Sequence, residues 1–215
     1  MFMYSAVQGA RIAATPERSV ITLPTSQPEA VPLDVALQEL SERMREDLSP
    51  EQRARLMNIA GDMCFDAGQR ERALLYYDAC IDLYLSASRF AASAAICEKL
   101  VRLNPEVVRA RCTLAWLAIA RGLDDEARRR VEEYGEAALR LERPTVAQRQ
   151  LRAMAEEVTN EEVLEAVAHA LLKLGDAVSA DRVFGMTHDP TAQRRRRYAT
   201  TEDRDRAIIC RLTQG

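Results

Sequence analysis

The sequence has few of the residue types from which catalytic and metal sites are usually built. It contains two histidines, and its five cysteines form no C-x-x-C pair. Structural metal sites need closely spaced cysteine and histidine ligands, so the sequence predicts no metal site. The patterns G-x-S-x-G, H-E-x-x-H and G-x-G-x-x-G and the P-loop are missing too. We therefore expect a protein that is not an enzyme and needs no cofactor.

Long apolar stretches and an excess of positive charge are also lacking. No window approaches the ~20 apolar residues of a membrane-spanning helix, and residues 1–14 do not have the pattern of a signal peptide. The net charge of −3 excludes an overall nucleic-acid-binding composition. Aromatic residues make up 5% of the chain, which suits helices packed through small side chains. These features predict a soluble, cytoplasmic protein with reduced thiols.

A recurring pattern of helical periodicity is the main positive signal. Three apolar helical runs each end at a glycine, and each glycine precedes an alanine by five residues: Gly68 and Ala73, Gly122 and Ala127, Gly175 and Ala180. The glycines are 54 and 53 residues apart. Glycine is favoured just after a helix because it adopts a left-handed backbone without strain. An internal repeat of this kind predicts stacked helical units, each of which buries its apolar face against its neighbours.

The periodicity divides the chain into three segments. Residues 33–185 predict an all-α array of about nine antiparallel helices, with breaks at 49–50, 68–69, 104–105, 122–123, 143–144, 159–160 and 175–176. Residues 1–32 carry four prolines and predict an irregular N-terminal arm. Residues 186–215 predict a charged, Arg-rich C-terminal tail, whose end is the apolar run 207–210. The helix around Cys112–Ala120 is apolar almost all round, which predicts that it lies at the centre of the stack.

Residues 57–80 resemble a tetratricopeptide repeat. Ala60-Gly61, Gly68, Ala73, Tyr77 and Cys80 have the spacing of that family, and the segments around Gly122 and Gly175 match it less fully. The resemblance covers about residues 50–185 and implies an α-solenoid that binds proteins. The family repeats every 34 residues, whereas the pattern here returns after about 54, or three helices. A register of helix pairs at 70–103, 106–141 and 144–174 gives a period nearer 34. The sequence therefore leaves open whether the repeat unit has two helices or three.

The resemblance implies that the first helix of each pair lines a groove for a peptide or a partner helix. The matching positions are Arg55, Asn58, Asp62, Phe65, Arg109, Cys112, Trp116, Glu162, Glu165, His169 and Lys173. Tryptophan is prominent in protein interfaces, so Trp116 is the foremost candidate, although core packing explains it equally well. The paired Lys and Asn of the family's carboxylate clamp are missing, which argues against a ligand with a free chain terminus.

The basic run in the tail supports a second class of function. Arg194, Arg195, Arg196 and Arg197 suit contacts with phosphates or with an acidic protein surface. Acidic residues follow at 202, 203 and 205, and residues 186–215 have a net charge of +3, so folding of the tail back on the acidic body is slightly favoured. The leading hypothesis is an adaptor or scaffold that binds a protein partner. The alternatives are a regulatory or nucleic-acid-associated protein that uses the tail, and a structural subunit of a larger complex held by its terminal arms.

Overall fold

The computed structural model describes residues 32–187, and every regular element among them is an α-helix. In chain order the helices are α1 (Leu33–Met44), α2 (Pro50–Asp66), α3 (Arg70–Ser86), α4 (Phe90–Leu103), α5 (Val108–Arg121), α6 (Asp124–Arg140), α7 (Pro144–Glu157), α8 (Glu161–Lys173) and α9 (Ala177–Thr187). The predicted all-α array of nine helices is thus confirmed within residues 33–187. Both predicted arms, residues 1–32 and 186–215, lie outside the described residues except for Pro32 and the last two residues of α9.

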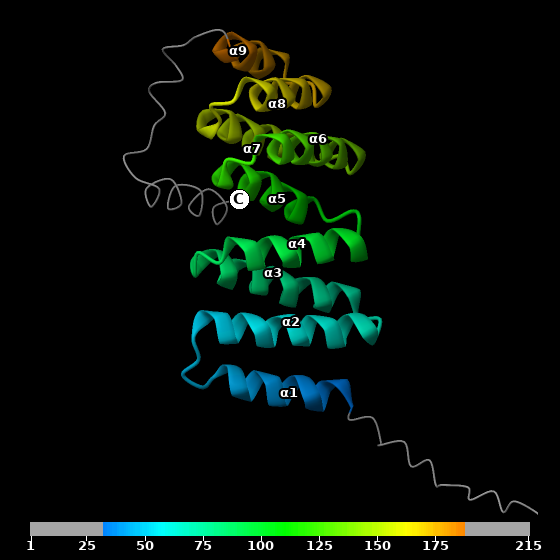
Figure 1. The fold of residues 1–215 in the computed structure, drawn as a ribbon. Helices are drawn as coiled ribbons and strands as arrows, with labels where there is room; N and C mark the ends of the chain where they lie inside the picture. Colours follow the sequence, from blue (N-terminus) through cyan, green and yellow to red (C-terminus); the bar gives the residue numbers. More distant parts are fainter. Residues whose placement is uncertain (1–31, 188–215) are drawn as a thin grey trace, which may run out of the picture. The chain divides into compact units, whose positions relative to one another are not determined.

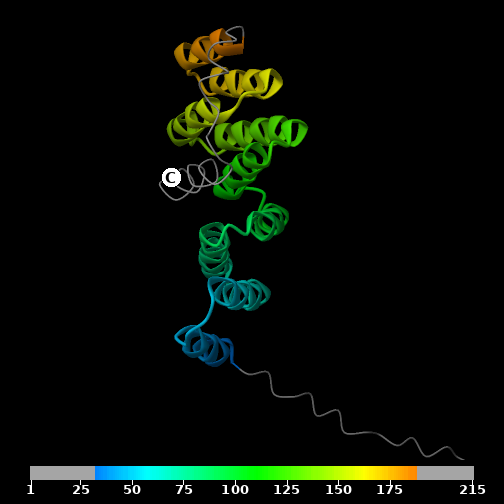
Figure 2. The ribbon, with the colours of Figure 1, turned by 60° about the vertical axis from the view of Figure 1, so that its left-hand side comes forward.

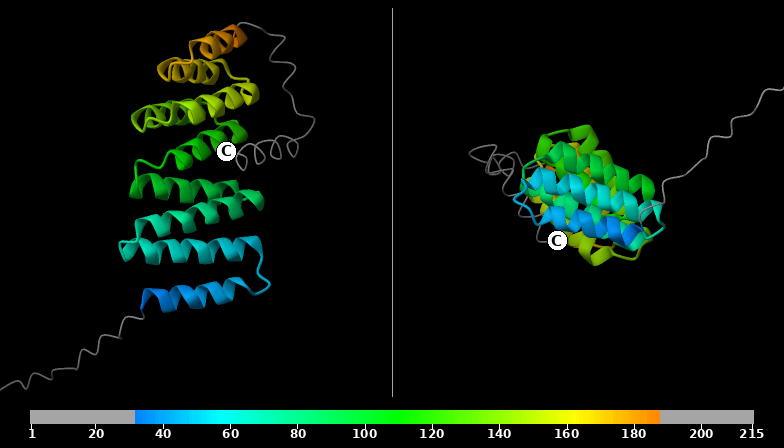
Figure 3. Two further views of the ribbon diagram at one scale, coloured as in Figure 1. Left: turned by 180° about the vertical axis from the view of Figure 1, so that it is seen from behind. Right: turned by 90° about the horizontal axis from the view of Figure 1, so that it is seen from below.

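The helices follow one another as a stack in which successive helices reverse direction (Figure 1). Each helix packs against the next one in the chain, and α5 also contacts α7 while α6 contacts α8. Seen from a second direction, α3, α7 and α9 lie to one side of α4, α6 and α8, so the stack has two layers (Figure 2). The view from behind shows the same order from α1 to α9 (Figure 3). This arrangement buries one face of each helix against its neighbours, as the repeat pattern predicts.

Five of the joints share one backbone geometry, a left-handed residue one or two positions after the last residue of the helix. Positive φ angles occur at Gly68, Gly122 and Gly175, and also at Ser88 and Glu142. At each joint the amide of the following residue donates to a carbonyl five residues back, as in Gln69 to Cys64 (2.8 Å). These are the hydrogen bonds of a Schellman motif. The left-handed positions recur 54 residues apart at Ser88 and Glu142, as at Gly68 and Gly122, which favours the three-helix unit.

The N-termini of α2, α5 and α7 differ in how they are capped. Ser49 and Gln52 form a capping box: the Gln52 amide donates to Ser49 Oγ (3.2 Å) and the Ser49 amide to Gln52 Oε1 (2.9 Å). Asn104 does not cap α5, which starts four residues later; its side chain accepts from the Glu106 amide instead (3.1 Å). Gln148 does not cap α7 either, because its side chain donates to the carbonyl of Leu174 (2.8 Å).

The core consists of two clusters of apolar side chains that meet at α5. One cluster gathers side chains of α1–α5, and the other gathers side chains of α5–α9. Ala110 and every residue from Thr113 to Ala120 are buried. The prediction that this helix lies at the centre of the stack is therefore confirmed. It positions the groove described below, because the first half of α5 forms the floor of that groove.

The joints permit a test of the left-handed geometry. A Cβ atom at Gly122 would meet nothing within 4 Å, so Gly122→Ala adds backbone strain and no clash. We expect Gly122→Ala to lower the free energy of unfolding by about 1 kcal/mol, and Ser88→Gly and Glu142→Gly to raise it by about 0.5–1 kcal/mol. Urea unfolding followed by circular dichroism measures both effects. A stabilising Gly122→Ala, or a destabilising Ser88→Gly, would contradict the assignment of these joints.

Candidate functional site

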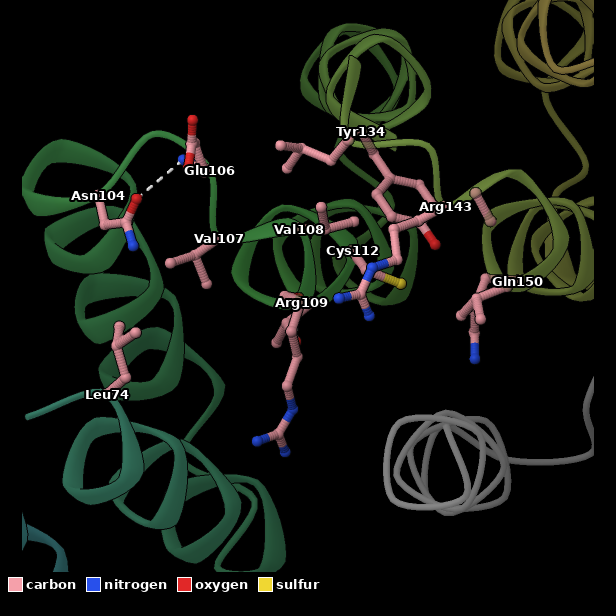
Figure 4. Close-up of a pocket in the computed structure, with 14 residues that line it drawn as sticks. Leu74, Asn104, Glu106, Val107, Val108, Arg109, Cys112, Tyr134, Arg143 and Gln150 are labelled. Atoms are coloured by element: carbon pink, nitrogen blue, oxygen red, sulfur yellow. Dashed lines mark hydrogen bonds between the residues drawn. The ribbon is translucent and has the colours of Figure 1, made fainter. Parts of the chain in front are cut away.

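A groove of about 640 Å³ opens beside the first half of α5 (Figure 4). Its walls come from α3, from the α4–α5 connection, from the end of α6 and from the start of α7. It is lined by Leu74, Asn104, Glu106, Val107, Val108, Arg109, Cys112, Thr113, Tyr134, Leu141, Arg143, Val146, Ala147 and Gln150. This volume is in the range of pockets that bind small molecules or a few residues of a peptide. The groove combines four separate parts of the chain, from residue 74 to residue 150.

Aliphatic side chains dominate the groove, and charged groups stand among them. Leu74, Val107, Val108 and Val146 supply an apolar surface, and Val146 is 47% exposed. The α4–α5 connection carries one of these valines, and a second begins α5, because α5 starts late, after the Asx turn at Asn104. An apolar surface with a few charged groups is the usual composition of a binding site for a peptide or ligand.

The two arginines of the groove differ in their electrostatic surroundings. Arg109 forms ion pairs with Asp78 (3.1 Å) and Asp82 (2.5 Å) of α3. Burial raises the pKa of Asp78, and the neighbouring Arg109 opposes that rise. Arg143 takes part in none of the ion pairs found between described residues, and the same is true of Arg149, which is close enough to act on Tyr134. The groove therefore presents positive charge that its own residues do not neutralise.

The Cys112 thiol and the Tyr134 phenol at the floor of the groove are unreactive at neutral pH because both stay protonated. Burial raises the pKa of Cys112 to about 12, partly opposed by a hydrogen bond with Tyr134. Burial also raises the pKa of the Tyr134 phenol. A thiol with so high a pKa is almost entirely protonated at neutral pH and is a poor nucleophile. The groove is thus suited to binding rather than to covalent chemistry.

The raised pKa values of three thiols predict how the free energy of unfolding changes with pH. Burial raises the pKa of Cys80, Cys97 and Cys112 from the ordinary value of 9.0 to about 12, so the folded state favours the neutral thiols. The resulting stabilisation is complete below pH 9 and is lost as the pH rises towards 12. We expect the urea midpoint to fall steadily from pH 9 upward. Iodoacetamide at pH 8 should leave the buried thiols of Cys80 and Cys97 unmodified in the folded protein, and their rapid modification would contradict the assignment.

Trp116 does not line the groove. Its side chain is fully buried (0% exposed), and its Nε1–H donates to Oε1 of Gln150 at 3.0 Å. Of the two interpretations of Trp116, the structure matches core packing. The cause is local: every residue of α5 from Thr113 to Ala120 is buried, so Trp116 in the second half of the helix has no open face. Of the predicted groove positions, Arg109 and Cys112 line the observed groove.

Asn58 and Asp62 were expected to be free groove side chains, and both are half-buried and paired. Tyr77 donates its hydroxyl to Asp62 (2.5 Å), and the Lys99 ammonium pairs with Asp62 and donates to Asn58 Oδ1 (3.1 Å). The ammonium also lies over the Tyr77 ring, 4.8 Å from its centroid. Lys99 of α4 contacts this face of α2, and neither Asn58 nor Asp62 lines the observed groove. These contacts make a polar cluster that joins α2, α3 and α4.

The remaining predicted positions are scattered. Arg55 is exposed and hydrogen-bonds Tyr84, while Phe65 packs against the core cluster of α1–α5. Glu165 and His169 are exposed on α8, where the His169 ring meets Phe184 edge-on with centroids 5.3 Å apart. None of these four residues lines the groove. Arg194, Arg195, Arg196 and Arg197 lie outside the described residues.

Most residues of the groove were not predicted as binding residues. Val107 belongs to a connection, Leu74 to the second helix of a pair, and Arg143 and Val146 to the α6–α7 joint and the first turn after it. The prediction considered only the first helix of each pair and so omitted all four. One signal was present: Val107 and Val108 place two apolar side chains directly after Asn-Pro-Glu, at a break where polar residues are usual.

Comparison of the chain with protein-family models, with curated proteins and with solved structures finds no match. Within residues 32–187, no group of histidine, cysteine and acidic side chains is arranged to hold a metal ion. None of the described helices is long and apolar enough to cross a membrane. The groove is therefore the feature of the described chain on which a function can be argued.

Proposed function

We propose that the chain is a non-enzymatic adaptor that binds a peptide segment of a partner protein in the groove beside α5. The observation that supports this proposal most directly is the open apolar groove lined by Arg143, an arginine that pairs with no acidic side chain among the described residues. A peptide with aliphatic side chains next to acidic ones has matching chemistry, since it would bury Val108 and Val146 and neutralise Arg143. The tetratricopeptide-like pattern of residues 57–80 points to the same class of function, because helical arrays of that kind commonly bind peptides.

The groove lacks the groups that an alternative, catalytic use would need. Its thiol is protonated, it contains no histidine, and its acidic residue Glu106 stands without a nucleophile or base beside it. General acid–base and nucleophilic catalysis both require such partners within hydrogen-bonding distance. The composition of the groove therefore favours binding over catalysis.

A matched pair of substitutions tests the groove. Val146 and Leu139 are almost equally exposed (47% and 49%) and belong to the same helix pair, but only Val146 lines the groove. Peptides should first be selected from a random display library against the full-length protein. We expect Val146→Glu to weaken their binding about tenfold, because it removes an apolar contact and places a charge beside acidic ligands. Leu139→Glu should leave binding within about twofold.

The result separates the two classes of function. If Val146→Glu and Leu139→Glu affect the selected peptides equally, or if no peptide binds, the adaptor proposal fails. Salt-dependent retention of the protein on nucleic acid, lost when Arg194–Arg197 are replaced by serine, would then support the alternative that uses the tail. Titration by fluorescence anisotropy with labelled peptides provides the measurement.

A further inference from the structure

We propose that residues 202–212 of the chain's own C-terminal tail occupy the groove beside α5. The groove exposes aliphatic side chains and the guanidinium of Arg143, which forms no ion pair with another residue of the described range 32–187. The segment 202–212 carries matching groups: Glu202, Asp203 and Asp205 alternate with Arg204 and Arg206, and the apolar run 207–210, Arg211 and Leu212 follow. Binding of the tail segment in the groove does not depend on the function proposed above. Competition between this segment and a partner peptide does rest on that function.

Charge supports this occupant. Arg143 lines the groove, and Arg149 lies close enough to Tyr134 of the groove to lower the pKa of its phenol against the larger, opposite effect of burial. Neither arginine belongs to an ion pair between described residues. The three acidic residues at 202, 203 and 205 would supply counter-charges, provided that Arg204, Arg206 and Arg211 of the same segment face away from the groove. Arg109, by contrast, is already neutralised by Asp78 and Asp82 and needs no further partner.

The length of the connecting segment permits the contact. The described chain ends at Thr187 in α9, and 15 residues lead from there to Glu202. A chain of this length spans up to about 50 Å when extended. Neighbouring helices pack about 8–10 Å apart, so α5 lies at most about 40 Å from α9, even if every helix between them added a full layer. The tail can therefore reach the groove without any change in the array.

Tethering makes even a weak contact effective. A segment joined by a short flexible linker has an effective concentration in the millimolar range at its site. An intrinsic dissociation constant of about 1 mM would thus suffice for roughly half occupancy. A partner peptide has to displace the segment, so its apparent affinity is lowered by the fraction of grooves that the tail fills.

Disulfide trapping in the full-length chain tests whether the tail segment lies in the groove. Val146→Cys places a thiol in the groove, and Cys210 is the natural partner in the tail. Val178→Cys is the control, because Val178 is 82% exposed, does not line the groove and is nearer to Cys210 in sequence. Oxidised glutathione converts the two thiols into a disulfide and is reduced in turn. If the two cysteines met only by random collision, the disulfide would form about three times faster in the Val178→Cys protein. The chain segment between its two cysteines, 178–210, is half as long as the segment 146–210.

We expect the bridge between position 146 and Cys210 in the Val146→Cys protein to form at least about ten times faster than the bridge between position 178 and Cys210 in the control. Adding Ile209→Asp to the Val146→Cys protein should abolish this advantage. Equal rates, a faster reaction in the control, or bridges only between two molecules would overturn the proposed binding of the tail segment in the groove. Non-reducing electrophoresis and peptide mapping identify the bridges, and circular dichroism checks that each variant is folded.

Competition is measured separately with the selected peptides. Ile208→Asp combined with Ile209→Asp, in an otherwise natural chain, should raise their affinity at least about threefold, and an unchanged affinity would overturn the competition. The two proposals fail in different ways. If peptide binding depends on Val146 but the disulfide to Cys210 does not form, only the binding of the tail in the groove is refuted. A trapped tail without any peptide binding would refute the adaptor function alone.

Discussion

Trp116→Ala should lower the free energy of unfolding by about 3–5 kcal/mol, the usual cost of truncating a large buried aromatic side chain. Trp116 is fully buried, and α5 contributes side chains to both apolar clusters. The substitution leaves a cavity at the point where those clusters meet. It also leaves Oε1 of the buried Gln150 without its donor. Urea unfolding followed by circular dichroism measures the loss.

Two variants separate the cavity from the hydrogen bond. Trp116→Phe keeps an aromatic ring but removes the N–H group, so we expect it to lose about 1–3 kcal/mol from the unsatisfied amide. Gln150→Leu in the Trp116→Phe protein removes the orphaned acceptor and should recover part of that loss. If Trp116→Ala costs less than about 1 kcal/mol, the core placement of the tryptophan is wrong, and its role in an interface returns.

The joints of the array were predictable wherever the residue type reflects the local backbone. Gly68, Gly122 and Gly175 follow periodic apolar runs, and a left-handed residue at such a place favours glycine. Ser88 and Glu142 adopt the same geometry, with φ angles of 55° and 53°, although neither residue type signals it. At these two joints the surrounding helices enforce the turn against a local cost. Sequence patterns reveal local preferences and do not reveal such tertiary constraints.

The site was less predictable than the fold because its contacts are not local. Asp62 is paired with a lysine 37 residues further along the chain, which no helical spacing indicates. Trp116 illustrates a different limit, since a helix that is apolar all round offers no pattern to tell its core residues from its binding residues. The groove needs α3, α5, α6 and α7 together. Only the positions of Arg109 and Cys112 followed from the repeat.

Small residues allow α6 and α8 to pack closely. In a simple series of helix pairs, contacts between successive helices would dominate, whereas here α6 also packs directly on α8. A Cβ atom built on Gly135 of α6 would be 2.9 Å from the Cβ of Ala170 in α8, closer than such atoms approach. Glycine at 135 and alanine at 170 therefore allow the two helices to meet.

Gly135→Leu should consequently lower the free energy of unfolding by about 1–3 kcal/mol, because α6 and α8 must separate to admit the side chain. In an open helix the same change would stabilise, since glycine is the poorer helix former by about 0.8–1 kcal/mol. Gly185→Leu in α9 is the matched control: its Cβ would meet nothing within 4 Å, so it should be neutral or stabilising. Thermal and urea unfolding of both variants provide the comparison.

An exchange of small residues tests the contact itself. Gly135→Ala alone should destabilise the protein, despite the gain in helix propensity, because its new methyl group strikes Ala170. In the Ala170→Gly protein that methyl group has room, so Gly135→Ala should there be stabilising. A change of sign between the two backgrounds measures the coupling of α6 to α8 directly. The same effect in both backgrounds would mean that the helices do not meet at these residues, and the packing of α6 on α8 would have to be revised.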